Sequence, residues 1–312
     1  MKLFYYQRPD QASNFGDALN PWLWHQLLPD VFNDNEATTF FGIGTLLNNL
    51  LPHRAPKARH IVVFSSGVGY ESGLPAIDAS RWTIYCVRGP LSAQKLGLSP
   101  QLAVADGGIL VRRLFQATGT KVSNFSFMPH VHHANDGDIV WQKICKQTGF
   151  RYIDPRCPVE EVLSAISQTK VLLAEAMHGA IVADALRVPW IPVRTSARIL
   201  TFKWQDWCAS IGVKYQPAYI LPLIAGYPPL ARGVRSTGRV TLHWLNWLRQ
   251  GQFSLAQNEW QNRQELIAQQ LLQIAQTANP ILSSDERIEQ LTEQLELRIQ
   301  QFKLDLATPK FP

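Results

Sequence analysis

Strand-like apolar runs alternate with helix-like stretches along most of this chain, and the turns between them are rich in Gly, Asp, Asn and His. Such an alternation is typical of parallel sheets whose strands are joined by crossover helices. In the first half the predicted strands are Leu3–Tyr6, Thr38–Phe41, Ile61–Ser65, Trp82–Val87 and Leu102–Val104. In the second half they are Asn124–Met128, Phe150–Ile153, Val171–Ala174 and Trp190–Val193.

The chain has 312 residues, more than one hydrophobic core usually serves, so we expect two domains. The pattern predicts an α/β fold with two Rossmann-like domains, residues 1–118 and 119–235, facing each other across a cleft. Residues 236–312 change in character to Trp, Gln and Leu and are predicted to form a helical tail. A binding site is expected at the junction of the two domains.

The tail carries apolar residues at helical spacing: Trp244, Leu248, Trp260, Ile267, Leu271 and Ile274. Its last helix is predicted to begin at a capping-box pattern, Ser283 to Glu286. That helix would place one apolar stripe on one face: Ile288, Leu291, Leu295, Ile299 and Phe302. Docking on the rest of the chain or pairing of subunits in a homo-oligomer could equally bury this stripe.

Composition excludes several classes of protein. No run of about 18 apolar residues could span a bilayer, and the first ten residues lack the apolar core of a secretory signal, so the sequence predicts a cytoplasmic protein. Its four cysteines have no Cys-x-x-Cys or Cys/His spacing, which favours reduced, buried thiols. The net charge of +6 favours anionic partners, but no nucleic-acid-binding motif accompanies it, so we expect no nucleic-acid partner.

The sharpest local signal is the segment from Lys170 to Leu186, in which a buried-type strand runs directly into a helix with His178 and Gly179 at the corner. The amino end of a helix favours anions, and a histidine there can add a charged donor or transfer a proton. Gly179 would let a ligand approach the backbone closely. The alternative is a capping histidine with a purely structural role.

Other turns that follow predicted strands also carry polar residues or glycines. In α/β proteins ligands bind outside the carboxyl ends of the strands. These turns contain Asn14, Gly16, Asp17, Gly44, Ser66, Gly67, Arg88, Asp106 and His130. The structural alternatives are a turn or helix cap for Asp17 and Asp106, a surface ion pair for Arg88 and a hinge at His130.

Four of these segments together resemble the polysaccharide pyruvyl transferases. They are Asn14-Phe15-Gly16-Asp17-Ala18-Leu19-Asn20, Gly42-Ile43-Gly44-Thr45, Arg88-Gly89-Pro90-Leu91-Ser92 and Glu175-Ala176-Met177-His178-Gly179-Ala180. The resemblance covers roughly residues 1–225 and rests on the order and spacing of the segments. Many members have Arg two residues before the His, where this chain has Ala176; the Glu-Ala version is similar to a subgroup that includes exopolysaccharide enzymes.

The resemblance implies a GT-B-like arrangement of the two domains, with the donor site in the second. It also implies transfer of the enolpyruvyl unit of phosphoenolpyruvate to two hydroxyls of a polysaccharide or lipid-linked sugar, which gives a pyruvate ketal and phosphate. No cofactor is implied beyond phosphoenolpyruvate as co-substrate. His130, His132 and His133 form a tempting metal cluster, but nothing in ketal formation demands a metal, and we predict none.

Phosphoenolpyruvate carries a phosphate and a carboxylate, so its site needs cationic side chains and N–H donors in fixed positions. Arg88 and Lys203 are the candidate cations, and Glu175 belongs to the same motif as His178. His178 would protonate the donor or stabilise the leaving phosphate, and Asp17 would orient or deprotonate an acceptor hydroxyl. For Lys203 the alternative is a solvated lysine beside a packed Trp204.

Two other functions share these features: a GT-B glycosyltransferase that uses a nucleotide sugar, and a noncatalytic partner in polysaccharide assembly.

A separate hypothesis concerns the stretch between Asp206 and Glu259, which has no acidic residue. It contains Lys214, Tyr227, Arg232, Arg235, Arg239, Trp244, Trp247 and Arg249. Basic and aromatic side chains together suit peripheral contact with an anionic membrane or a lipid pyrophosphate; ordinary basic surface is the alternative.

Overall fold

The computed structural model describes residues 1–33, 35–70, 73–117, 119–196, 199–223, 253–308 and 311, with side chains in the last helices from residue 261 onward. Most of the predicted basic and aromatic stretch lies outside these residues: Tyr227, Arg232, Arg235, Arg239, Trp244, Trp247 and Arg249. The predicted tail position Leu248 also lies outside them, as does the side chain of Trp260.

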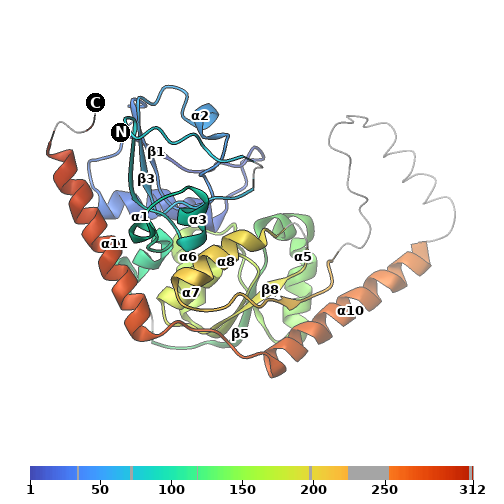
Figure 1. The fold of residues 1–312 in the computed structure, drawn as a ribbon. Helices are drawn as coiled ribbons and strands as arrows, with labels where there is room; N and C mark the ends of the chain where they lie inside the picture. Colours follow the sequence, from blue (N-terminus) through green and yellow to red (C-terminus); the bar gives the residue numbers. More distant parts are fainter. Residues whose placement is uncertain are drawn as a thin grey trace, which may run out of the picture.

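The first sheet has four parallel strands in the order β1-β2-β3-β4 (Figure 1). Their bounds are β1 (Lys2–Phe4), β2 (Thr38–Phe41), β3 (His60–Phe64) and β4 (Trp82–Cys86). β2 and β3 are buried along their whole length, and neither alternates apolar with polar residues.

The second sheet has five parallel strands in the order β6-β5-β7-β8-β9. They are β5 (Ser123–Met128), β6 (Arg151–Tyr152), β7 (Thr169–Ala174), β8 (Trp190–Arg194) and β9 (Ala218–Tyr219). The chain goes from β5 to β6 on one side and then returns to β7 on the other, so the order reverses between β5 and β7. In doubly wound sheets the crevice at such a reversal is where ligands bind.

Helices connect and cover the strands. In the first half they are α1 (Phe15–Leu27), α2 (Leu51–Arg54), α3 (Pro90–Lys95) and α4 (Val111–Leu114), with the 3-10 turns η1 (Pro100–Leu102) and η2 (Gly107–Leu110). The second half has α5 (Val131–Thr148), α6 (Val159–Ser167), α7 (Met177–Ala185) and α8 (Thr201–Ser210). The tail contributes α10 (Phe253–Thr277) and α11 (Asp285–Leu306). The predicted α/β fold with parallel sheets and C-terminal helices is therefore confirmed.

One hydrophobic cluster joins the two halves. It runs from α1 and η2 of the first half into α6, α7 and α11, and includes the buried Phe15, Ile109, Ile181 and Trp207. Because this core is shared, the two sheets are held in a fixed relation and the loops at their carboxyl ends meet.

One predicted strand is not formed, and one observed strand was not predicted. Leu102–Val104 is not a strand: Leu102 is the last residue of the 3-10 turn η1, and a single parallel bridge joins Ala103 to Val87. The two-residue strand β9 was not predicted, because so short an edge strand carries no periodic signal.

The sequence predicts that a helix begins at Asn20-Pro21, just after Asp17, but this is wrong, because α1 begins at Phe15 and contains Pro21 in its interior. Proline has no N–H to donate to the carbonyl of Asp17, four residues earlier. The side chain of Asn20 compensates, since its Nδ2 donates to that carbonyl at 3.3 Å. Asp17 therefore lies in the first turn of α1 and not in a turn before the helix.

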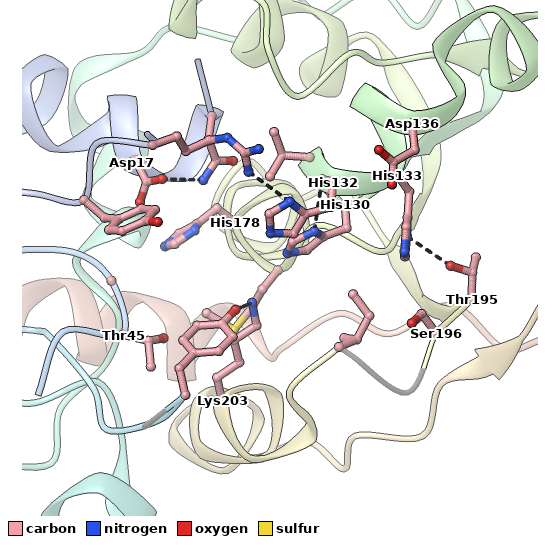
Figure 2. A pocket seen from close by; sticks show the side chains of 18 of the residues that line it. Asp17, Thr45, His130, His132, His133, Asp136, His178, Thr195, Ser196 and Lys203 are labelled. Atoms are coloured by element: carbon pink, nitrogen blue, oxygen red, sulfur yellow. Dashed lines mark hydrogen bonds between the residues drawn. The ribbon is translucent and has the colours of Figure 1, made fainter. Parts of the chain in front are cut away.

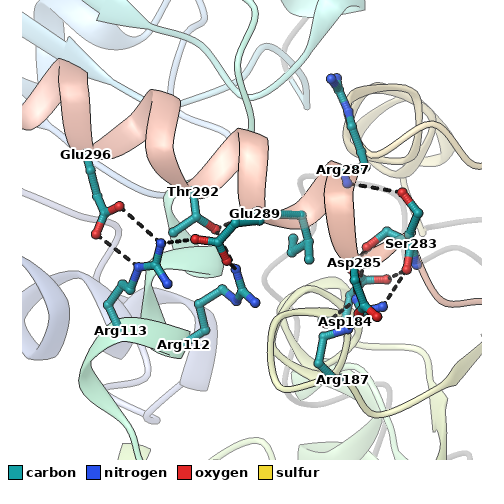
Figure 3. A network of polar contacts seen from close by, with 12 residues as sticks. Arg112, Arg113, Asp184, Arg187, Ser283, Asp285, Arg287, Glu289, Thr292 and Glu296 are labelled. Carbon is teal, nitrogen blue, oxygen red and sulfur yellow. Dashed lines mark hydrogen bonds and ion pairs between the residues drawn. The ribbon is translucent and has the colours of Figure 1, made fainter.

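The apolar stripe of α11 is buried within the chain, which answers the question that the sequence left open. Ile288, Leu291, Leu295, Ile299 and Phe302 all join the main core. Figure 1 shows α11, in red, running beside the first half, and Figure 3 shows Arg112 and Arg113 paired with Glu289 and Glu296 along the helix. The N-cap is Ser284, whose hydroxyl accepts from the N–H of Arg287 at 3.1 Å, so the predicted cap at Ser283 is one residue early.

Among the helices that the structure describes, none has the length and apolar character needed to cross a membrane. All four cysteines are free; Cys86, Cys145 and Cys208 are buried and Cys157 is half-buried, close to the prediction.

Candidate active site

A cavity of about 1270 Å³ lies where loops of the two halves meet (Figure 2). The first half contributes Tyr6, Arg8, Asn14, Asp17, Gly44, Thr45, Leu46, Leu50, Arg54 and Tyr70. The second half contributes His130, Val131, His132, His133, Asp136, Trp141, Met177, His178, Thr195, Ser196, Ile199, Lys203, Pro222 and Leu223. Six predicted site residues are in this lining: Asn14, Asp17, Gly44, His130, His178 and Lys203.

Four helices begin at this cavity. First-turn residues of α1, α5, α7 and α8 line it, namely Asp17, His132, His178 and Lys203. The amino end of each helix carries a partial positive charge and unpaired N–H groups, so their convergence favours an anion. The histidines follow β5 and β7, at the strand-order reversal: His130 precedes α5, and His132, His133 and His178 lie in the first turns of α5 and α7.

His178 lies at the corner between β7 and α7, as the sequence predicts. Its ring packs against Gly16, where an added Cβ would lie 2.1 Å from Nδ1. Its Nε2 is buried and lies 3.7 Å from Oδ2 of Asp106. The other carboxylate oxygen of Asp106 accepts from the N–H of Gly108 at 2.9 Å and caps η2, as the alternative interpretation of that residue expected.

Asp17 is the acidic residue that the first half contributes to the cavity lining (Figure 2). Its Oδ2 accepts from the side-chain amide of Asn14 at 2.6 Å. Burial raises the pKa of Asp17 above its usual value, while the bond from Asn14 and the charges of His178 and Lys203 oppose that rise. A carboxylate made more basic in this way is suited to accept a proton.

Lys203 points into the cavity from α8, and only 7% of it is exposed, so it is not the solvated lysine of the alternative interpretation. Its Nζ donates to Oη of Tyr70 at 2.6 Å. The backbone of Tyr70 has φ +69°, a left-handed conformation that a non-glycine residue rarely adopts. The two residues come from opposite halves and place an ammonium group inside the cavity.

Arg8, from the first half, is a second cation in the cavity lining, and it contacts His132 of the second half. Asp10 fixes its guanidinium through Nε at 2.9 Å and Nη2 at 2.5 Å, and Nη1 lies 3.1 Å from Nδ1 of His132. Since arginine can only donate, Nδ1 of His132 must accept. Burial, together with the charge of Arg8, lowers the pKa of His132.

His130 precedes α5 and its Nδ1 accepts from the N–H of His132 at 3.3 Å, which leaves the proton on Nε2. Burial and the charge of Lys203 hold the pKa of His130 well below its usual value. At neutral pH it is therefore a neutral hydrogen-bond donor toward the cavity. Within the described part of the chain, no three His, Cys, Asp or Glu residues are grouped so that they could hold a metal ion.

Glu175 is fully buried behind the cavity and does not line it. One carboxylate oxygen accepts from the N–H and hydroxyl of Thr195, at 2.9 and 2.5 Å, and the other from the N–H of His130 and Nδ1 of His133, at 2.9 and 2.7 Å. Burial alone would raise the pKa of Glu175, but these bonds outweigh it and lower the pKa. Glu175 thus ties together the loops that follow β5, β7 and β8.

Arg88, predicted to contact the donor, lies outside the cavity lining and is fully buried. Its Nε pairs with Oδ2 of Asp206 at 3.0 Å, Nη1 donates to Thr45 Oγ1 at 2.8 Å, and Nη2 donates to the carbonyl of Val68 at 3.0 Å. The pair is buried, and so it is not the surface ion pair of the alternative interpretation either.

Of the remaining predicted residues, Gly44 lines the cavity, and its φ of +131° suits glycine. Gly16, Ser66, Gly67 and Gly179 do not line it. Gly67 packs on the guanidinium of Arg88, Gly179 packs on the sulfur of Met128, and the hydroxyl of Ser66 donates to the carbonyl of Gly42. Gly16 and Gly67 thus act by leaving room for larger side chains.

Several lining residues were not predicted: Arg8, Arg54, Tyr70, Thr195 and Ser196. His132 and His133 were considered only as metal ligands, and they also line the cavity. Arg8 and Thr195 follow the carboxyl ends of β1 and β8, so the strand-end rule could have found them. The contact between Arg8 and His132 spans 124 residues and gives no local signal.

The fold and the site define an α/β protein with a basic, histidine-rich cavity between two parallel sheets. A family model described as "Polysaccharide pyruvyl transferase" matches residues 30–196. The succinoglycan biosynthesis protein ExoV of Rhizobium meliloti (strain 1021) is 41% identical over 239 residues, which cover 76% of this chain and 73% of that protein. No solved structure gives a significant match. The chain belongs to the polysaccharide pyruvyl transferase family, which implies a transferase and confirms the resemblance found in its sequence.

Proposed function

We propose that this protein transfers the enolpyruvyl unit of phosphoenolpyruvate to two hydroxyls of a sugar in exopolysaccharide biosynthesis, forming a pyruvate ketal and phosphate. The observation that carries this proposal is the convergence of Lys203, Arg8 and the amino ends of four helices on one cavity with His178 in its lining. A doubly anionic donor matches this charge.

Donor binding would use cations that reach the cavity from elements other than the corner between β7 and α7. Ala176 stands where many family members have Arg, and Lys203 can supply the missing charge; Arg8 lies in the same lining but is already paired with Asp10. His130, a neutral donor through Nε2, can add a hydrogen bond. We do not assign Arg88 to the donor, because Asp206, Thr45 and Val68 already occupy its guanidinium.

The first chemical step would be proton transfer to the donor. His178 gives its proton to the methylene carbon; the C=C electron pair forms the new C–H bond, and positive charge develops at C2. A sugar hydroxyl adds at C2 while its proton passes to Asp17, whose raised pKa suits this role.

The second step expels phosphate. The C2–O bond to phosphate breaks with its electron pair on the leaving oxygen, and the second sugar hydroxyl bonds to C2. Its proton leaves with the phosphate, and the proton held by Asp17 passes to His178, so that both residues return to their starting states. Overall, one phosphoenolpyruvate and one sugar diol react to give one pyruvate ketal and one phosphate.

The acceptor would share the cavity with the donor. A pocket for one drug-sized ligand is roughly 300–1,000 Å³, and this cavity, at about 1270 Å³, exceeds that range. We propose a polysaccharide or lipid-linked sugar as acceptor and a GT-B-like arrangement of domains 1–118 and 119–235. Two sheets with the cavity between their loops support this arrangement.

The test is phosphate release from phosphoenolpyruvate with a panel of β-galactose, glucose and N-acetylmannosamine acceptors. We expect acceptor-dependent release that falls about 10²–10⁴-fold in His178→Ala. His53→Ala, at an exposed histidine of α2 outside the cavity, is the matched control and should retain activity. Release from no acceptor in the panel, together with stabilisation by nucleotide sugars alone, would favour a GT-B glycosyltransferase; stabilisation by neither ligand would favour a noncatalytic partner.

A further inference from the structure

A pair of buried polar atoms lies near the cavity, one from each half of the chain. Nε2 of His178 and Oδ2 of Asp106 are 3.7 Å apart, and neither makes a hydrogen bond within the part of the chain that the structure describes. A buried polar atom left unpaired costs about 1–3 kcal/mol, so such atoms are rare in native proteins. An unpaired donor beside an unpaired acceptor therefore indicates that the two belong together.

The carboxylate of Asp106 is fixed so that only one oxygen can reach the histidine. Its Oδ1 accepts from the N–H of Gly108 at 2.9 Å, and the side chain is fully buried. This leaves Oδ2 directed at Nε2. Asp106 follows the first sheet and His178 follows β7, so the contact joins the two halves at the cavity.

The opposite side of the imidazole is fixed by Gly16. An added Cβ at that position would lie 2.1 Å from Nδ1 and 2.8 Å from Cγ, so glycine is what leaves room for the ring. Nε2 is sealed from solvent, while the side chain as a whole is 16% exposed and lines the cavity. Nδ1 is therefore the nitrogen that remains for a ligand.

We propose that Asp106 is a positioning residue that holds the proton of His178 on Nε2, so that His178 acts on the donor through Nδ1. This rests on the proposed role of His178 in proton transfer. In the neutral ring the carboxylate fixes the tautomer with Nε2–H and directs the Nδ1 lone pair to the cavity. When Nδ1 takes up a proton from Asp17, the same carboxylate stabilises the imidazolium, which then gives that proton to the methylene carbon.

The first test needs only the wild-type protein. In ¹⁵N-histidine-labelled protein, long-range ¹H–¹⁵N correlation spectra distinguish the two neutral tautomers, and His178→Asn identifies the signal. We expect the neutral ring of His178 to carry its proton on Nε2. A proton on Nδ1 would overturn the proposal.

The second test is Asp106→Asn, which keeps the shape and removes the charge. We expect kcat for phosphate release to fall about 10²-fold or more, KM for phosphoenolpyruvate to change less than about threefold, and the tautomer preference to weaken. Asp184→Asn is the matched control: Asp184 is equally buried and lies on the helix of His178, but its carboxylate accepts from Trp190 and Ser283, away from the cavity. It should leave the tautomer unchanged.

The outcomes separate this proposal from the proposed function. If His178→Ala abolishes phosphate release while Asp106→Asn changes neither kcat nor the tautomer, the role of Asp106 is wrong and the function stands. If Asp106→Asn raises KM with kcat unchanged, Asp106 contacts the substrate, which also overturns the positioning role. If His178→Ala leaves phosphate release intact, the proposed function of His178 fails.

Discussion

The guanidinium of Arg88 and the carboxylate of Asp206 form an ion pair sealed from solvent, with Nε 3.0 Å from Oδ2. Arg88 follows β4 of the first half, and Asp206 is on α8 of the second. Asp206 also accepts from the N–H and hydroxyl of Ser92, at 2.9 and 2.5 Å. The pair thus connects the two halves beneath the cavity.

Arg88→Met should destabilise the protein by about 3–5 kcal/mol, because it leaves a buried carboxylate without its cation. Urea unfolding measures this loss. The double variant Arg88→Met/Asp206→Leu should recover part of it, since no unpaired charge remains. A variant of unchanged stability but with a raised KM for phosphoenolpyruvate would instead make Arg88 a donor contact.

Gly16→Ala should reduce kcat about 10²-fold with a smaller effect on folding. The new methyl group lies where the imidazole of His178 packs, and a displacement of about 1 Å at a reacting group can cost that much. Steady-state phosphate release is the measurement. Gly119→Ala is the control, because a Cβ there meets nothing within 4 Å; equal losses in the two variants would contradict the packing role of Gly16.

Glu175→Gln should destabilise the protein in a way that depends on pH. The folded pKa of Glu175 is below its usual value of 4.5, so its ionised form stabilises the fold above that pH, and the contribution is lost as pH falls through the folded pKa. Each charge-assisted hydrogen bond lost costs roughly 1.5–3 kcal/mol. Unfolding curves of the two proteins should therefore differ most above pH 4.5 and converge in acid; a constant difference would contradict this.

The C-terminal helix α11 should depend on its apolar face far more than on its ion pairs. Phe302 is fully buried against Phe40 and Tyr85, so Phe302→Ala should cost about 3–5 kcal/mol. Glu289→Gln, at a carboxylate that is 38% exposed, should cost about 1 kcal/mol or less. Thermal unfolding distinguishes the two, and the reverse order would show that polar contacts hold the helix.

Much of the fold could be predicted because a buried strand followed by an amphipathic helix has a local pattern. The strand over Thr38–Phe41 was predicted with its observed bounds, and the corner at His178 follows from an apolar run meeting a helix start. Proline was misleading at Pro21, since the compensating bond from Asn20 has no signature in the sequence.

The site was harder to predict than the fold, since its composition depends on contacts between distant residues. Lys203 and His178 lie in the cavity as expected, and they stay predictions as binding and catalytic residues. Arg88 lies outside the cavity because it pairs with Asp206, which is 118 residues away. Arg8 lies in the cavity lining, where it contacts His132. Periodicity and motifs report on neighbours in sequence, so the pairing of Arg88 with Asp206 could not be anticipated, whereas the strand-end rule could have placed Arg8 near the cavity.

The cationic cavity as receptor for phosphoenolpyruvate is tested most directly by calorimetric titration of the donor into wild type, Lys203→Met and Lys170→Met. Lys203 is inside the cavity and Lys170 is an exposed lysine outside it. A charged hydrogen bond is worth about 1.5–3 kcal/mol, so we predict binding at least about tenfold weaker in Lys203→Met and unchanged in Lys170→Met. Equal affinity in all three proteins, or no binding to wild type, would contradict the assignment.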